Sequence, residues 1–281
     1  MTVETRLRRP ISEAEVAAYA ADGVVHLKGL FGPELVERLR DLVEADMAKH
    51  SRMQLELSKE GDPGRFYGNT FVWKQTPGFR EVVYESGLAE AAGRIMAAGK
   101  VNIVFDQLLV KEPGTSERTR WHHDLPYWPI LGDQVATLWL ALDEVTAESG
   151  AVEYIRGSHL WGQRFKAEAF KEGVEYQEDL PPVPDIEAER ARHEILQFEL
   201  APGDCTLHHG LTLHAAPGNA RADRRRRAYV TRWAGDDVTY HPRPGIQPMY
   251  EDPAIAAGDA LDSDLWPVVW RSGPGDALRR T

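Results

Sequence analysis

Residues 121–159 read WHHDLPYWPILGDQVATLWLALDEVTAESGAVEYIRGSH, and the start of this stretch decides how the rest is interpreted. In an extended backbone, residues two positions apart point to the same face. His122 and Asp124 would therefore present an imidazole and a carboxylate to one ion, whereas His123 would point elsewhere. An isolated pair of this kind arises often by chance, so the surrounding residues have to support it.

A second histidine from a distant segment would complete a set of two histidines and one carboxylate. Such a set leaves coordination positions open and suits Fe(II) that must also bind a co-substrate and O₂. Three later histidines, His208, His209 and His214, are candidates, and residue type alone does not choose among them.

Further features follow the pair along the chain. They are Trp139 in an apolar strand, Asp143-Glu144 in a turn, Ser149-Gly150 in a hairpin, Gly157-Ser158-His159, then HHGLTLHAAPGN at 208–219 and RRRRAYVTRW at 224–233. In combination they resemble the phytanoyl-CoA dioxygenase family of Fe(II)/2-oxoglutarate-dependent oxygenases. The opening residues 11–31 also resemble the family's first helix and strand, and the resemblance extends to about Trp233.

The resemblance implies a mainly β fold with helical additions, a double-stranded β-helix, which is a distorted, cupin-like jelly roll. It implies Fe(II) bound by His122, Asp124 and His214, with 2-oxoglutarate and O₂ as co-substrates. Hydroxylation of an unactivated C–H bond is the expected outcome, because related halogenases lack the carboxylate ligand. Desaturation and epoxidation use the same ligands and stay open. So does a cupin-like isomerase or hydrolase without O₂ chemistry, whereas a non-catalytic relative would be expected to have lost a ligand.

The 2-oxoglutarate site follows from the same resemblance. The strand that carries Trp139 is expected to line it, with Gln107 as a contact from the preceding strand. Lys74 and His123 stand where family members often have polar residues, although the family usually has glutamine at the place of His123.

The arginine for the distal carboxylate of 2-oxoglutarate comes from the run Arg224 to Arg227. A guanidinium binds a carboxylate through two parallel hydrogen bonds, which lysine cannot match. Strand alternation puts Arg224 and Arg226 on one face and Arg225 and Arg227 on the other. The family has an arginine, one variable residue and then a small residue; Ala228 fits the small residue and selects Arg226. Counting from His214 instead allows Arg225.

Aromatic residues close to the metal ligands in the sequence are candidates for a substrate pocket: Phe71, Trp73, Tyr127, Trp128 and Trp161. The ordinary fate of such side chains is the core. The long, charged segment 165–193 contains three prolines and is expected to be a lid or binding loop, because connections of this length are unusual inside a domain.

Periodicity and turn residues predict the elements. Helices are expected at 11–21, where Ser12 and Glu15 form a capping box, at 34–50 and at 85–98, with a strand at 24–30 and a polar loop at 51–70. Strands are expected at 101–111, 136–142, 151–155, 195–200, 204–208 and 228–234. We expect a single domain, 1–281, with N-terminal helices at about 11–100, a β-helix core at about 101–240 and an irregular C-terminal tail.

The composition of the whole chain limits its partners. A net charge of −11 over 281 residues argues against nucleic acid, and no apolar stretch is long enough to cross a membrane. Cys205 is the only cysteine, which excludes a disulfide framework, and no apolar leader opens the chain, so a cytoplasmic location is expected. The expected partner is a small-molecule substrate of unknown identity, and the oligomeric state is left open.

Overall fold

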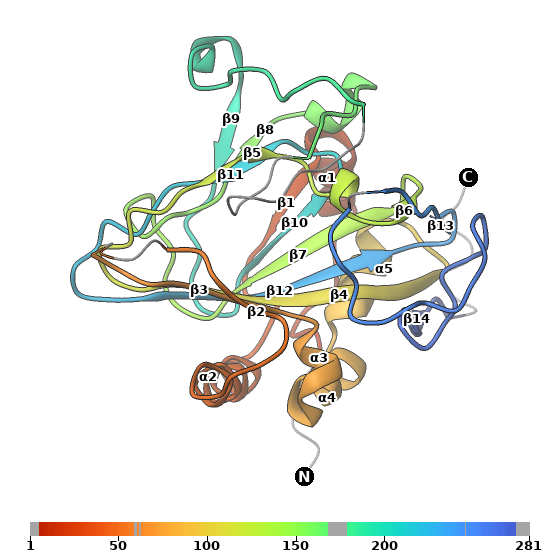
Figure 1. Ribbon diagram of the computed structural model, residues 1–281, viewed down its shortest axis with the longest axis horizontal. Coiled ribbons are helices and arrows are strands. Elements are labelled where there is room, and N and C mark those ends of the chain that lie inside the picture. Colours follow the sequence, from red (N-terminus) through yellow and green to blue (C-terminus); the bar gives the residue numbers. More distant parts are fainter. Residues whose placement is uncertain (1–5, 59–60, 62, 168–178, 245, 274–281) are drawn as a thin grey trace.

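Two antiparallel β-sheets face each other, and helices cover the outer face of the larger one (Figure 1). This arrangement is seen in a computed structural model that describes residues 6–58, 61, 63–167, 179–244 and 246–273. Among these residues, no helix is both long and apolar enough to cross a membrane.

The large sheet contains eight strands from both ends and the middle of the chain. Its order is β1 (Val24–Leu27), β10 (Cys205–His209), β7 (Val135–Ala141), β12 (Arg226–Ala234), β4 (Lys100–Lys111), β3 (Phe66–Thr70) and β2 (Gln54–Glu56), with β14 (Val268–Arg271) also paired to β4.

The small sheet carries the segments that matter most for chemistry. Its order is β5 (Thr119–His122), β11 (His214–Ala216), β8 (Glu153–Ile155) and β9 (Ile195–Gln197). A separate pair joins β13 (Thr239–Tyr240) to β6 (Ile130–Leu131).

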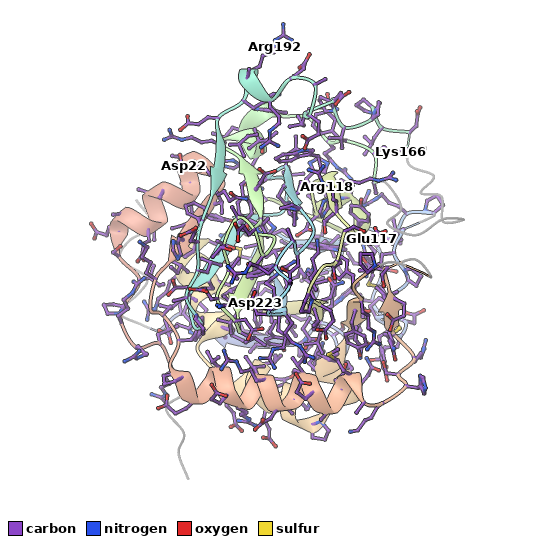
Figure 2. All side chains as sticks on the ribbon, turned by 90° about the vertical axis from the view of Figure 1, so that its left-hand side faces the viewer. Asp22, Glu117, Arg118, Lys166, Arg192 and Asp223 are labelled. Atoms are coloured by element: carbon purple, nitrogen blue, oxygen red, sulfur yellow. The ribbon has the colours of Figure 1, made fainter. Side chains whose placement is uncertain are left out.

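The helices precede the central strands in the chain. They are α1 (Glu13–Asp22), α2 (Pro33–Met47), α3 (Val72–Gln75), α4 (Pro77–Glu85) and α5 (Leu88–Ile95). Ser12 and Glu15 form the expected capping box at the start of α1. In Figure 2, α2 lies at one end of the molecule, whereas Arg192, in the 3₁₀ turn η3 (Arg190–Arg192), marks the opposite end beyond the small sheet.

Side-chain alternation gives the large sheet two different faces. Leu138 and Leu140 of β7 belong to the core that includes the helices, whereas Trp139 and Ala141 pack toward the small sheet. A contact between the sheets is made by Tyr154 of β8, whose hydroxyl lies 2.8 Å from that of Thr206. The face toward the helices is therefore apolar and supports the sheet, while the inner face is available to functional side chains.

Several of the predicted elements need correction. Residues 51–70 are not one loop, because β2 and β3 extend the large sheet there. The expected helix at 85–98 is the shorter α5, which begins at Leu88, and α4, which ends at Glu85, was not predicted. The C-terminal tail is not wholly irregular, because β14 pairs with β4.

The predicted lid lies partly outside the described residues, which omit 168–178. Of the remainder, Phe165 and Ile186 are buried with Trp121 and Leu213 against the small sheet. The indole nitrogen of Trp121 donates a hydrogen bond to Glu187 at 2.8 Å. These described residues thus pack on the outer side of the sheet that carries two of the predicted ligands.

Candidate metal centre

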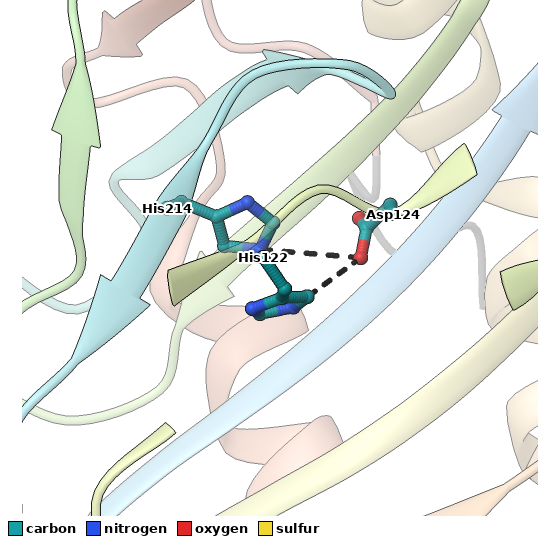
Figure 3. A group of neighbouring side chains, drawn as sticks. All are labelled: His122, Asp124 and His214. Atoms are coloured by element: carbon teal, nitrogen blue, oxygen red, sulfur yellow. Dashed lines mark ion pairs between the residues drawn. The ribbon is translucent and has the colours of Figure 1, made fainter. Parts of the chain in front are cut away.

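His122, Asp124 and His214 lie together where β5 and β11 pair (Figure 3). His122 is the last residue of β5, and His214 is the first of β11, directly opposite it in register. One donor atom from each of the three buried residues lies within 4.8 Å of the other two, close enough to share one ion. Strand pairing therefore joins segments that are far apart in the sequence.

The backbone around Asp124 differs from the extended form expected. The strand ends at His122, and Asp124 has φ −73° and ψ −43°, at the start of the 3₁₀ turn η1 (Leu125–Tyr127). The turn nevertheless directs Oδ1 of Asp124 toward both imidazoles, 3.7 Å from Nε2 of His122 and 3.9 Å from Nε2 of His214. These separations exceed hydrogen-bond lengths, as is expected of atoms that bind a common ion.

Each imidazole is oriented by its other nitrogen. Nδ1 of His122 lies 2.8 Å from the carbonyl oxygen of Arg120, and Nδ1 of His214 lies 2.9 Å from that of Thr212. A carbonyl only accepts, so Nδ1 carries the proton and Nε2 carries the lone pair. Metal-binding histidines are typically held in this way.

The second oxygen of Asp124 is held by two residues. Oδ2 accepts a hydrogen bond from the hydroxyl of Thr137 at 2.5 Å and lies 3.3 Å from Nε2 of His208. These contacts fix the carboxylate so that Oδ1 faces the two histidines. His208 was expected only to be a non-ligand, and its contact with the carboxylate was not predicted from the sequence.

Protonation states also suit a metal. Burial, together with the neighbouring histidines, lowers the pKa of His122 to about 3 and that of His214 to about 4. Burial alone would raise the pKa of Asp124, but the hydrogen bond from His208 and the charges of His214 and Arg232 hold it well below its usual value. Near neutral pH the group therefore offers two neutral imidazoles and one carboxylate, the forms that bind metals.

The four adjacent arginines have contrasting surroundings. Arg225 forms ion pairs with Glu44 at 2.7 Å and Glu112 at 3.1 Å. Arg224 and Arg227 likewise form ion pairs with acidic residues. Arg226 is only 2 % exposed, and its guanidinium lies 5.2 Å from the ring centre of Trp139. Burial lowers its pKa to about 10, so it stays charged, yet no described residue accepts a hydrogen bond from it.

Arg232 is a second buried cation on the same face of β12. It is 7 % exposed, its Nη2 donates to Oε1 of Gln107 at 2.8 Å, and its guanidinium lies 4.5 Å from the ring centre of Phe105. Burial lowers its pKa to about 10. Arg232 was not predicted from the sequence, although it lies six positions after Arg226 and so shares its face by strand alternation.

Known proteins are similar to this chain in both sequence and fold. The model of the family described as phytanoyl-CoA dioxygenase matches residues 19–228. The chain belongs to this family. The predicted resemblance to the family is thus confirmed, and the matched residues include all three of the metal group.

Individual relatives agree with the family match. The multifunctional dioxygenase prhA of Penicillium brasilianum is 28 % identical over an alignment that covers 75 % of this chain and 68 % of the relative. The dioxygenase hkm4 of Aspergillus hancockii is 26 % identical, with 75 % of this chain and 67 % of the relative covered.

Solved structures confirm the predicted double-stranded β-helix of this phytanoyl-CoA dioxygenase family member. The α-ketoglutarate-dependent carbocyclase SnoK of nogalamycin biosynthesis superposes with a TM-score of 0.73 at 24 % identity, covering 92 % of this chain and 97 % of SnoK. The epimerase SnoN, solved with Fe³⁺, α-ketoglutarate and nogalamycin RO, also gives 0.73, at 21 % identity, covering 92 % of this chain and 98 % of SnoN.

The structure does not bring three of the predicted residues of this family member to the metal group. The ammonium of Lys74 is bound by Glu251 at 2.6 Å and by the carbonyl of Asp264 at 2.7 Å. Trp73 belongs to the core on the helix side of the large sheet. Nε2 of His123 accepts a hydrogen bond from the backbone N–H of Phe165 at 2.9 Å, because adjacent residues point in opposite directions.

The other aromatic candidates have different surroundings. Tyr127 lies edge-on to His122 with ring centres 5.8 Å apart. Phe71 and Trp128 contact Phe105, the residue beneath Arg232, at ring-centre distances of 5.3 and 5.4 Å. Trp161 is 40 % exposed and lies against His193, outside this cluster.

Proposed function

We propose that this protein is an Fe(II)- and 2-oxoglutarate-dependent oxygenase that hydroxylates an unactivated C–H bond of a small metabolite. The proposal rests on two features that occur together. One is the buried, ionised Asp124 between two oriented histidines, and the other is the buried Arg226, whose charge no described residue neutralises. The first feature suits a divalent metal, and the second suits a carboxylate ligand.

The metal would be bound by Nε2 of His122, Nε2 of His214 and Oδ1 of Asp124. The donor set fits Fe(II), because two imidazoles and one carboxylate on one side leave positions for further ligands. Thr137 and His208 would keep the carboxylate oriented through Oδ2. When bound, the metal supplies the activation of O₂, which the protein's own side chains cannot perform.

2-Oxoglutarate would be held at its distal carboxylate by Arg226. The face of Trp139 beneath the guanidinium keeps the arginine in place and limits its hydration. Since Gln107 is bound to Arg232, we assign the co-substrate to Arg226 and Trp139 and give Gln107 the task of positioning Arg232. The pairing of Arg225 with Glu44 and Glu112 removes the main alternative.

Hydroxylation is the outcome that the ligand set favours, because Asp124 fills the position that a halide needs. A second outcome, ring closure or epimerisation, has its own support in the likeness to the carbocyclase SnoK and the epimerase SnoN. A metal-dependent isomerase or hydrolase without O₂ chemistry would need no dicarboxylate co-substrate, so the charge of Arg226 would have no ligand to bind.

The test combines cofactor binding with product analysis. Anaerobic addition of Fe(II) and 2-oxoglutarate should give a weak visible absorption band, and air with a panel of metabolites should then give succinate only with a substrate. Mass spectrometry should show a product heavier by one oxygen atom. Failure to form both the band and succinate would refute the cofactor assignment. A product of unchanged mass, or one lacking two hydrogens, would replace hydroxylation with epimerisation or with ring closure or desaturation.

A further inference from the structure

Arg232 has hydrogen-bond donors that no described residue uses. Its Nη2 is bound to Gln107, but its Nε and Nη1 are buried without a hydrogen-bond partner. No carboxylate among the described residues forms an ion pair with it. A buried guanidinium with unused donors is costly, so an acceptor is expected to come from a ligand.

Strand register places Arg232 beside the metal group. Arg232 lies opposite Thr137 in the pairing of β12 with β7, and the hydroxyl of Thr137 is bound to Asp124. Arg226, at the start of the same strand, instead lies opposite Lys111 of β4. In the proposed function, 2-oxoglutarate would place one carboxylate at the metal and the other at Arg226, which would leave Arg232 for the substrate that is oxidised.

The surroundings of the guanidinium are aromatic. Phe105 lies beneath it, and Phe71 and Trp128 pack against Phe105. All three rings are almost completely buried, so the guanidinium has little competing water. A cation in apolar surroundings selects a ligand that combines an anionic oxygen group with an apolar, ring-like body.

We propose that Arg232 binds the carboxylate of a ring-bearing organic acid and thereby orients that substrate at the metal centre. The proposal rests on the proposed function, since it concerns the substrate of the same site. Gln107 is a positioning residue here, because its hydrogen bond fixes one side of the guanidinium and leaves Nε and Nη1 for the carboxylate.

The test compares acids with their neutral amides. Benzoate, cinnamate and biphenylcarboxylate, each against its amide, are titrated calorimetrically into the full chain with Fe(II) and 2-oxoglutarate under argon. At least one acid should bind about 10-fold or more tightly than its amide, because a buried charged pair is worth this much or more. Arg232→Gln should bring the ratio close to one, whereas Arg225→Gln should leave it unchanged. No preference in the unmodified protein, or a preference that survives in Arg232→Gln, would overturn the proposal.

The absorption band of the Fe(II)–2-oxoglutarate complex, recorded in the same samples, separates the two proposals. A band retained in Arg232→Gln supports a role apart from the co-substrate, and a lost band in a folded variant assigns Arg232 to 2-oxoglutarate and refutes this inference alone. Absence of the band in the unmodified protein refutes the proposed function, while the acid-to-amide ratio still decides whether Arg232 binds carboxylates.

A second variant covers the case in which Arg232→Gln does not fold. Gln107→Glu keeps the side-chain length and supplies a carboxylate to Arg232 from within the protein. The acid preference should then fall to about that of the amides, since the guanidinium is already neutralised. An unchanged preference in folded Gln107→Glu contradicts the inference.

Discussion

The two faces of the large sheet use the same strands for different purposes. Toward the helices, Leu138 of β7 and Tyr229 of β12 are buried in an apolar core. Toward the small sheet, the same strands present Thr137, which holds the carboxylate of the metal group, and two arginines of β12 with unused donors. One face gains stability from burial, whereas the other retains buried guanidinium donors that the described residues leave without an acceptor.

The largest expected effect comes from removing the carboxylate on the inner face. Asp124→Ala should abolish the visible band formed with Fe(II) and 2-oxoglutarate, and should lower turnover by at least about 100-fold, the loss caused even by residues that only support a ligand. The band is measured anaerobically by absorption spectroscopy. Asp133→Ala, which alters an exposed carboxylate nearby, is the control. An unchanged band in Asp124→Ala would show that Asp124 is not a ligand.

The second effect concerns the arginine that lies over Trp139. Arg226→Ala should raise the KM for 2-oxoglutarate by roughly 30-fold or more, because losing one partner of a buried charged pair costs about 2 kcal/mol or more. Arg225→Ala, which removes an exposed pairing with Glu44, should change this KM little. Steady-state kinetics with 2-oxoglutarate varied would measure both. The reverse result would transfer the role to Arg225, and no change in either would remove the main support for this co-substrate.

Strand alternation and motif spacing in the sequence predicted many of the functional side chains on the inner face. The metal group was predicted because His122 and Asp124 lie two residues apart and the pattern around His214 is specific. Strand alternation put Arg226 on one face with Arg224, and the family pattern before Ala228 selected Arg226, which proves to be buried and unpaired. The same alternation, continued along β12, also places Arg232 on this face, but the family resemblance assigns a role only to an arginine at the start of that strand.

Positions fixed by turns were less predictable. Phe71 precedes α3 with a φ of 56°, in the left-handed region that non-glycine residues rarely adopt. The reversal puts Trp73 on the helix side and directs Lys74 toward Glu251. Neither periodicity nor composition signals this turn, so both residues were assigned to the wrong surroundings. β2 and β3 were missed because their sequences are polar or glycine-containing, although β3 pairs with β4 and β2 pairs in turn with β3.

A third prediction tests the apolar face. Leu138 is completely buried toward the helices, so Leu138→Ala should lower the free energy of unfolding by about 2–5 kcal/mol. Leu131→Ala, at a residue that is 40 % exposed, should have a much smaller effect. Chemical denaturation measures both, and the Fe(II)–2-oxoglutarate band should persist in folded Leu138→Ala. Loss of the band at full folding would show that the two faces are not independent.

A fourth prediction concerns a lysine on the inner face whose hydrogen bonds the protein itself provides. The side-chain nitrogen of Lys111 donates hydrogen bonds to the carbonyl oxygens of Glu117 at 2.8 Å and Pro217 at 2.6 Å. Burial, together with the charge of Arg226, lowers the pKa of Lys111 to about 6. In the unfolded chain the ordinary value of about 10.4 applies, so between these two values the unfolded chain holds a proton that the folded protein lacks.

The free energy of unfolding should therefore rise with pH across this window, by at most about 1.4 kcal/mol per pH unit from Lys111. Below about pH 6, Lys111 should no longer make the free energy of unfolding depend on pH, because it is protonated in both states. Lys111→Met removes the titrating group, so its free energy of unfolding should rise less steeply with pH than that of the unmodified protein. Urea denaturation of the metal-free protein at several pH values between about 6 and 9 measures the slopes. Lys49→Met, at an exposed lysine, should leave the slope unchanged. Equal slopes of the free energy of unfolding against pH in Lys111→Met and the unmodified protein would mean that Lys111 stays protonated in the folded protein. Hydrogen bonds to two carbonyl oxygens would then be enough to stabilise a charged lysine on the inner face beside Arg226.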